Sequence, residues 1–206
     1  MILQDYYWFY KSVIPKRMCD HIIAYGNAQR EHTALIGDNT NKSQTDMEFV
    51  KRKRNSHIAW LNDPWIYRQI QPYVEDANVR ANWNFDIDYA ETIQFTKYKH
   101  DQYYDWHCDG WYHTYNKPED PAMHGKIRKV SMIVSLSEPT DYEGGQLEFD
   151  PRNEDHDSGR NILECKEIRP KGSVVVFPSF LWHRVKPVTK GLRYSLVVWN
   201  IGYPFK

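Results

Sequence analysis

Short segments with the patterning of β-strands fill the second half of this sequence. They lie at residues 90–98, 130–136, 145–149, 172–177 and 192–199, and the third follows a Gly144-Gly145 turn. Their alternating or continuous apolar residues are typical of half-buried and buried strands. Because helical patterns come before residue 85 and many short strands follow, we expect an α+β fold whose C-terminal part is a closed antiparallel sandwich or jelly roll.

The first part of the chain predicts supporting helices. Residues 15–30 place Met18, Ile22, Ile23 and Tyr25 near one helical face, and Gly26 is expected to fray the helix end. Residues 32–46 are polar and predict a loop, 56–61 predict a strand, and Asn62-Asp63-Pro64 begins a second helix, with Asp63 as its cap. We expect one domain over residues 1–206, with helical support at about 1–85 and a β core at about 86–203.

Charge and composition narrow the kinds of partner. The formal net charge is zero, which argues against nucleic acid as a partner, and the basic run at 51–54 is interpreted as a solvated strand edge or turn. No apolar stretch has the length of a membrane span, so no membrane partner is expected. Cys19, Cys108 and Cys165 are odd in number and widely spaced, which indicates a reducing, cytoplasmic protein without disulfides.

A metal-ligand pattern lies at residues 104–109, Tyr-Asp-Trp-His-Cys-Asp. On a strand, His107 and Asp109 project to the same side, so one segment offers two ligands. His183, from a distant strand, would complete a set of two histidines and one carboxylate, which suits non-haem Fe(II) because it leaves coordination positions open. A His-x-Asp pair alone is weak evidence in a chain with 9 histidines, so the residues around it decide.

Two residues suited to binding a carboxylate begin ten residues after His183. Arg193 and Ser195 are two apart, so a strand presents their guanidinium and hydroxyl groups on one face. A guanidinium fork binds a carboxylate in bidentate fashion. If the metal holds the keto-acid end of 2-oxoglutarate, Arg193 is placed to receive the distal carboxylate, with Ser195 beside it.

The motifs between Thr92 and Trp199 resemble one family in order and spacing. They are Gln94-x3-Tyr98-x5-Tyr104-x2-His107-x-Asp109, Glu143-Gly-Gly145, Phe177-Pro-Ser and His183-x3-Pro187-Val188-x2-Gly191-x-Arg193-x5-Trp199. Over about half of the chain, this pattern resembles the prolyl 4-hydroxylase-like branch of the 2-oxoglutarate/Fe(II)-dependent dioxygenases. Two departures stand out. Collagen-type members carry Lys where this chain has Arg193, and residues 99–101 replace a glycine-rich turn.

The resemblance implies a double-stranded β-helix core with N-terminal helices. It implies that His107, Asp109 and His183 bind Fe(II), that Arg193 and Tyr98 hold the C5 carboxylate of 2-oxoglutarate, and that Trp199 packs around that pocket. It further implies O2 as a cosubstrate and ascorbate as an optional reductant. The implied reaction is hydroxylation of a prolyl residue in a peptide or protein, with release of succinate and CO2.

Two alternatives and three questions stay open at this level. The enzyme could act instead on a free amino acid or another small molecule, or the chain could be a non-catalytic, cupin-like metal-binding module, since a fold does not fix a function. The residues do not reveal the exact substrate or the oligomeric state. Nor do they reveal whether the long loop at 110–126 closes over a substrate.

Overall fold

The computed structural model describes residues 3, 5–34, 53–110, 113–152 and 161–205. Its helices are α1 (Lys16–Asn27), α3 (Pro64–Arg80) and the short 3-10 helix η2 (Lys166–Ile168). Its strands are β1 (Trp8–Tyr10), β2 (His32–Thr33), β3 (Arg54–Asn55), β4 (His57–Leu61), β5 (Tyr89–Ala90), β6 (Ile93–Tyr98), β7 (Tyr103–His107), β8 (Ile127–Ser135), β9 (Tyr142–Gly144), β10 (Leu147–Asp150), β11 (Leu163–Glu164), β12 (Val174–Pro178), β13 (Trp182–Val185), β14 (Val188–Gly191) and β15 (Arg193–Gly202).

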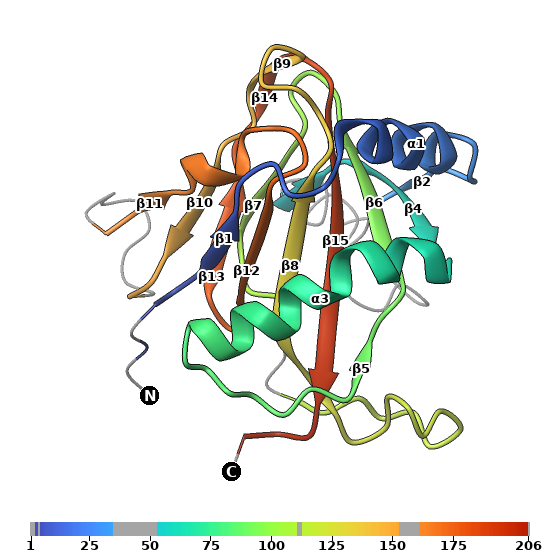
Figure 1. Ribbon diagram of the computed structural model, residues 1–206, viewed down its shortest axis with the longest axis vertical. Helices are drawn as coiled ribbons and strands as arrows, with labels where there is room; N and C mark the ends of the chain where they lie inside the picture. Colours follow the sequence, from blue (N-terminus) through green and yellow to red (C-terminus); the bar gives the residue numbers. More distant parts are fainter. Residues whose placement is uncertain (1–2, 4, 35–52, 111–112, 153–160, 206) are drawn as a thin grey trace.

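Two antiparallel sheets carry the architecture. The larger has eight strands, ordered β1-β12-β8-β15-β6-β4-β2 with β5 added to β15, and α1 and α3 lie on its outer face (Figure 1). The smaller has the order β11-β10-β13-β7-β3. Strands far apart in sequence are neighbours in both sheets, so the fold brings the two ends of the β-rich region together.

Alternation along the central strands divides the core into two layers. Val130, Met132 and Val134 of β8 pack toward the helices, with Ile66 and Ile70 of α3 in the same cluster. Ile133 of β8 and Val175 and Phe177 of β12 point the other way, into a second cluster with Leu147 and Phe149 of the smaller sheet. A period of two along each strand therefore buries both faces of the larger sheet.

Both predicted helices are present, with two local differences. Helix α1 continues through Gly26 and ends at Asn27. An added Cβ at Gly26 would lie 2.6 Å from the ring of Phe95, so glycine permits the close approach of this ring to the helix. Asp63 precedes α3 but makes no side-chain cap. It accepts a hydrogen bond from the Tyr25 hydroxyl at 2.9 Å and so links the two helices.

The N-terminal part also supplies strands. The predicted strand at 56–61 is β4, which pairs with β6, and His32–Thr33, predicted as loop, pairs with β4 as β2. The prediction of a solvated basic run at 51–54 is wrong at Arg54, whose relative exposure is 5%. Lys51 and Arg52, and most of the predicted loop, lie outside the described residues.

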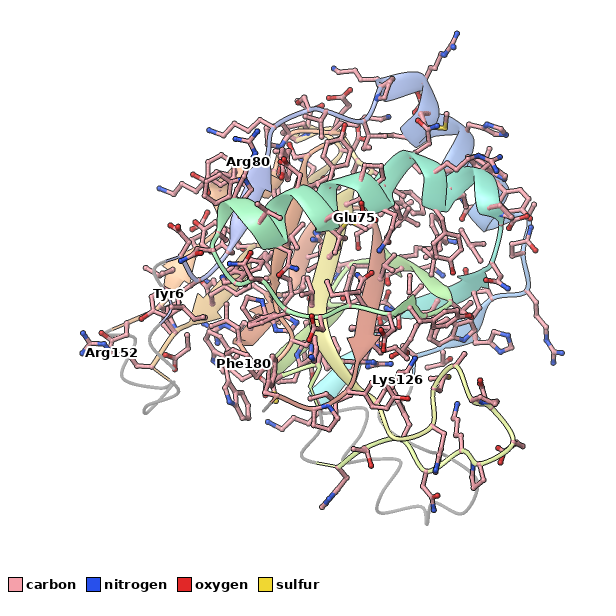
Figure 2. All side chains as sticks on the ribbon, turned by 60° about the horizontal axis from the view of Figure 1, so that its bottom comes forward. Tyr6, Glu75, Arg80, Lys126, Arg152 and Phe180 are labelled. Carbon is pink, nitrogen blue, oxygen red and sulfur yellow. The ribbon has the colours of Figure 1, made fainter. Side chains whose placement is uncertain are left out.

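The described part of the long loop, residues 113–126, is tied back at its base. The Tyr115 amide donates to the Lys126 carbonyl at 2.9 Å, and the Tyr115 hydroxyl donates to Glu91 at 2.8 Å. Figure 2 shows Lys126, at the base of this loop, and Phe180, between β12 and β13, at the same end of the molecule, away from Glu75 of α3. No helix among the described residues is long and apolar enough to cross a membrane.

Candidate metal centre

Two histidines meet across neighbouring strands of the smaller sheet. His183 of β13 lies directly opposite His107 of β7 in the strand register, and the centres of the two imidazole rings are 4.1 Å apart. Each ring donates a hydrogen bond from Nδ1 to the carbonyl two residues before it, at 2.8 Å to Asp105 and 2.9 Å to Leu181. Both Nε2 atoms are therefore left with free lone pairs on the same side.

Asp109 completes the cluster just beyond the end of β7. Its Oδ1 lies 3.7 Å from His107 Nε2 and its Oδ2 lies 3.6 Å from His183 Nε2. The three side chains offer ligand atoms within 4.8 Å of one another. Two imidazole nitrogens and one carboxylate oxygen at this spacing fit a divalent transition metal, and this donor set is the one used by non-haem Fe(II) oxygenases.

A pair of serines fixes the carboxylate of Asp109. The Ser131 hydroxyl donates to Asp109 Oδ2 at 2.8 Å and lies 2.9 Å from the Ser179 hydroxyl, and neither serine is exposed. The Gly110 amide donates to the Ser179 carbonyl at 2.7 Å, so the segment after Asp109 is held against the same loop. Such contacts around a ligand set its orientation.

The electrostatics of the cluster favour metal-binding protonation states. Burial, followed by the neighbouring His183, holds the pKa of His107 well below 6.5, so its imidazole is neutral near pH 7. Burial of Asp109 would raise the pKa of its carboxyl, but His183, His107, Arg128 and the Ser131 hydrogen bond lower it below its usual value. A neutral imidazole and an ionised carboxylate are the forms that bind metals.

The larger sheet brings together three of the predicted site residues on the face that packs toward the smaller sheet. They are Arg193, Tyr98 and Ser195. Arg193 opens β15 opposite Tyr98 of β6, and its guanidinium lies 5.3 Å from the centre of the Tyr98 ring. Arg193 Nη1 donates to the Ser195 hydroxyl at 3.3 Å. Gly145 makes room for this arginine, because a Cβ at Gly145 would lie 2.9 Å from Arg193 Cδ. All three side chains are almost fully buried.

Trp199 packs beside Arg128, whose side chain is partly buried. The Arg128 guanidinium lies 3.8 Å from the centre of the Trp199 ring and makes two hydrogen bonds to the carboxylate of Glu91, at 2.8 and 2.7 Å. Glu91 also accepts the hydrogen bond from Tyr115 in the long loop. The loop is thus connected to the wall of the barrel through one carboxylate.

The Tyr104 ring stacks against the His107 ring, and the Arg54 guanidinium lies over the Tyr104 ring. The Tyr104 and His107 ring centres are 3.4 Å apart, and the Arg54 guanidinium lies 4.5 Å from the Tyr104 ring centre. Sequence reasoning missed Arg54 because it belongs to a run of basic residues. The spacing of Arg54 and Ser56, two apart and so on one face, was the available signal.

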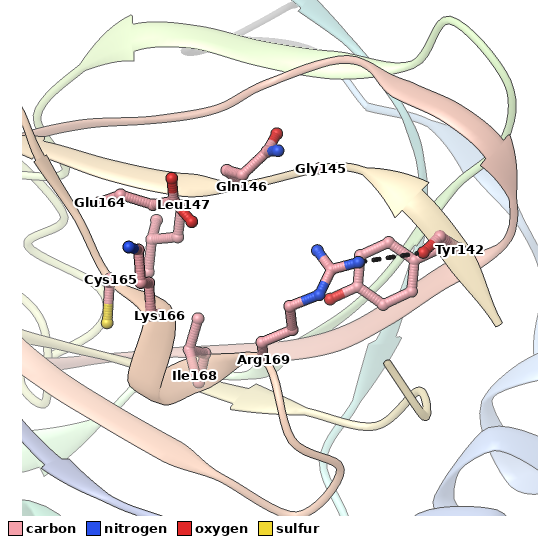
Figure 3. A pocket seen from close by; sticks show the side chains of 9 residues that line it. All are labelled: Tyr142, Gly145, Gln146, Leu147, Glu164, Cys165, Lys166, Ile168 and Arg169. Carbon is pink, nitrogen blue, oxygen red and sulfur yellow. Dashed lines mark hydrogen bonds between the residues drawn. The ribbon is translucent and has the colours of Figure 1, made fainter. Parts of the chain in front are cut away.

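A separate small pocket lies at the edge of the smaller sheet, between β9, β10, β11 and η2, and Gly145 is among the residues that line it. Figure 3 shows it between Tyr142, Cys165 and Arg169, and its volume of about 10 Å³ is roughly that of one water-sized sphere. None of the predicted site residues lines it.

Known proteins share the sequence pattern of the β core. The model of the 2OG-Fe(II) oxygenase superfamily matches residues 93–200. A PKHD-type hydroxylase of Synechococcus sp. is 33% identical over 101 residues, which cover 48% of this chain and 36% of that protein. A PKHD-type hydroxylase of Sphingopyxis alaskensis is 29% identical over 173 residues, which cover 77% of this chain and 72% of the relative. The match thus spans little more than a third of the Synechococcus relative.

Solved structures match over nearly the whole chain. The viral collagen prolyl hydroxylase of Paramecium Bursaria Chlorella virus-1, solved with 2OG, has a TM-score of 0.63 at 19% identity and covers 97% of both chains. A prolyl hydroxylase of Trichoplax adhaerens, solved with a peptide fragment of the hypoxia inducible factor oxygen degradation domain, has a TM-score of 0.61 at 17% identity, covering 96% of this chain and 84% of that one. These likenesses confirm the predicted double-stranded β-helix fold.

Proposed function

This chain belongs to the 2OG-Fe(II) oxygenase superfamily, and from that premise we propose that it hydroxylates a prolyl residue in a peptide or protein. The observation that carries the proposal is the convergence of His107, Asp109 and His183 within 4.8 Å, inside a fold shared with prolyl hydroxylases. Fe(II) and 2-oxoglutarate are the cofactor and cosubstrate that this family and donor set indicate.

In the proposed mechanism, His107 and His183 would hold Fe(II) through Nε2, and Asp109 would hold it through a carboxylate oxygen. A set of three protein ligands would leave the metal accessible to the cosubstrates. When bound, Fe(II) activates O2 for the oxidative decarboxylation of 2-oxoglutarate to succinate and CO2, with the second oxygen atom going to the substrate carbon. The residues of this chain supply geometry, charge and shielding for that chemistry.

Arg193 and Tyr98 are the residues that we propose for the distal carboxylate of 2-oxoglutarate. Arg193 is 3% exposed, and its remaining N–H groups are free of any carboxylate among the described residues. Burial raises the pKa of the Tyr98 hydroxyl, which keeps it protonated as a hydrogen-bond donor. Ser195 would orient the guanidinium through its hydrogen bond, and Trp199 would pack beside the pocket and limit the entry of water.

Proline as the target rests on what similar proteins are. The solved structures that match nearly all of this chain include a viral collagen prolyl hydroxylase and a prolyl hydroxylase in complex with a peptide fragment of hypoxia inducible factor. We also propose a reducing, cytoplasmic setting, since all three cysteines are free. The chain is proposed to act as one domain. A carboxylate clamp at Arg193 favours catalysis over a purely metal-binding role, because metal binding needs no second cation.

The test is a turnover assay on the purified protein with Fe(II), 2-oxoglutarate and ascorbate. Proline-containing peptides, free proline and other free amino acids are offered separately, and mass spectrometry follows addition of one oxygen atom to each while succinate is quantified. The proposal expects a hydroxylated prolyl residue and one succinate per hydroxyl group. His183→Ala serves as the inactive control.

Two outcomes would replace the proposal. Hydroxylation of a free amino acid, with every peptide unmodified, would move the substrate to the small-molecule class. If the protein bound the metal but formed no succinate, either in the presence of any of the substrates or in their absence, a metal-binding module would be favoured.

A further inference from the structure

Arg54 is a buried cation whose hydrogen-bonding capacity is partly unused. Its relative exposure is 5%, and its Nη2 is buried without a hydrogen-bond partner. Its Nε donates to the Ser56 hydroxyl at 3.1 Å, and its guanidinium lies over the Tyr104 ring. Leaving a buried charged donor unsatisfied is costly, so such a group in a folded protein calls for an explanation.

The pairing of the strands places Arg54 at one end of a row of neighbouring side chains, which runs through Ser56 and Tyr98 to Arg193. His57 of β4 pairs with Lys97 of β6, so Ser56, one residue earlier, continues the register beside Tyr98. Tyr98 in turn pairs with Arg193 of β15. Residues that pair directly point to the same face of a sheet, so Ser56, Tyr98 and Arg193 all face the barrel interior on adjacent strands.

The two guanidinium groups therefore flank Tyr98. Arg193 lies 5.3 Å from the Tyr98 ring, and Arg54 is bonded to the serine on the other side. Burial raises the pKa of Tyr98, and the positive charges of Arg54 and Arg193 both oppose that rise. Within the described parts of the chain, neither arginine forms an ion pair with a carboxylate. A pocket with two buried, unpaired guanidinium groups is suited to an organic anion.

We propose that Arg54 is a second cation of the cosubstrate pocket, and that its free Nη2 donates a hydrogen bond to the distal carboxylate of 2-oxoglutarate from the side opposite Arg193. The inference rests on the proposed roles of Arg193 and Tyr98, but not on proline as the substrate. The proposal also gives a role to Ser56. Its buried hydroxyl accepts a hydrogen bond from Arg54 Nε and so leaves Nη2 available for the cosubstrate. The distal carboxylate would then be bound from two sides with the Tyr98 hydroxyl between them.

The experiment compares two keto acids that differ only at the distal end. 2-Oxoglutarate has the second carboxylate, and 2-oxopentanoate has the same chain length without it. Dissociation constants are measured anaerobically on Fe(II)-loaded protein for the wild type and for Arg54→Met, which removes the charge but keeps a long apolar side chain against Tyr104. We expect Arg54→Met to raise the dissociation constant of 2-oxoglutarate by about 10-fold or more. The dissociation constant of 2-oxopentanoate should stay within about twofold of the wild-type value.

Controls separate this role from a structural one. Arg193→Met should show the same selectivity for 2-oxoglutarate, and Lys53→Met, which changes the exposed neighbour paired with Asp105, should change neither affinity. Arg54→Lys keeps the charge but not the fork and should fall between the wild type and Arg54→Met. Circular dichroism and the thermal midpoint of the metal-free variants verify folding.

Three results would overturn the proposal. Equal weakening of both keto acids would assign Arg54 to the iron end of the site or to the fold. Unchanged affinity for both, with a raised KM for a peptide, would assign it to the substrate. A wild-type protein that binds neither keto acid would remove the cosubstrate pocket, whereas binding without peptide hydroxylation would refute only proline as the target.

Discussion

His107 and His183 face each other across β7 and β13, 76 residues apart in the chain, with both Nδ1 atoms bonded to local carbonyls. This arrangement fixes the tautomer of each ring before any metal arrives, and Asp109 closes the third corner. The site is therefore preorganised: the fold has already provided the positions that a metal would otherwise have to impose on flexible side chains.

Removing one imidazole tests whether the three residues act together. We predict that His183→Ala lowers Fe(II) affinity by more than about 100-fold, because two ligands remain where three converged. Equilibrium dialysis under anaerobic conditions measures the change. His21→Ala is the matched control, since His21 stacks on Trp65 in the helical layer and should leave iron binding unchanged. Wild-type iron affinity in His183→Ala would contradict the assignment.

Arg193 provides a prediction for the cosubstrate. We expect Arg193→Ala to weaken 2-oxoglutarate binding by about 1.5–3 kcal/mol, which is about 10- to 150-fold, because a buried charge-assisted hydrogen bond is lost. Isothermal titration of the metal-loaded protein gives the value. Lys190→Ala removes a nearby exposed cation paired with Glu143 and should have no effect. An unchanged affinity in Arg193→Ala would exclude this residue from the pocket.

Ser131 should matter for iron although it is not a ligand. Ser131→Ala removes the hydrogen bond to Asp109 Oδ2, and we predict Fe(II) affinity about 10-fold weaker, at the lower end of what such outer contacts contribute. Ser173→Ala removes a similarly buried hydroxyl that accepts a hydrogen bond from the Ser12 amide, outside the site. If both variants bound iron equally well, the contact between Ser131 and Asp109 would have no role in metal binding.

The thiols provide a prediction that is independent of the metal. Burial raises the pKa of Cys19 to about 11 and that of Cys165 to about 12, against an ordinary value of 9.0. A higher pKa means less thiolate at pH 8, so we expect native Cys19 and Cys165 to react with a maleimide at least about 100-fold more slowly than in the unfolded chain. Peptide mapping by mass spectrometry after timed labelling measures each rate, and fast native labelling of Cys165 would contradict its burial.

How far the sequence predicted this molecule differs from residue to residue. The strands and the approach of His107, Asp109 and His183 were predictable, because alternation sets the face of a side chain and the spacing matches a family. The roles of Tyr98, Arg193 and Ser195 remain predictions. The structure places the three side chains together, on adjacent strands of the larger sheet.

Other features depend on contacts between distant residues and were not predictable locally. In the sequence, Arg54 belongs to a basic run that was predicted to be solvated. The pairing of β3 with β7 instead places its guanidinium over the Tyr104 ring, where the side chain is buried. Gly26 reads as a helix end, yet it is the point where Phe95 packs against α1. Ser131 is inconspicuous within an apolar strand, and only its distance to Asp109 identifies it.

The most direct test of the central claim is an anaerobic titration of the metal-free protein with Fe(II) and 2-oxoglutarate, followed by visible absorption. We predict the weak charge-transfer band of a keto acid chelated to Fe(II), present in the wild type and absent in Asp109→Ala. If iron binds and no band develops at saturating 2-oxoglutarate, the three residues form a metal site without the chemistry of this family, and the proposed function is wrong.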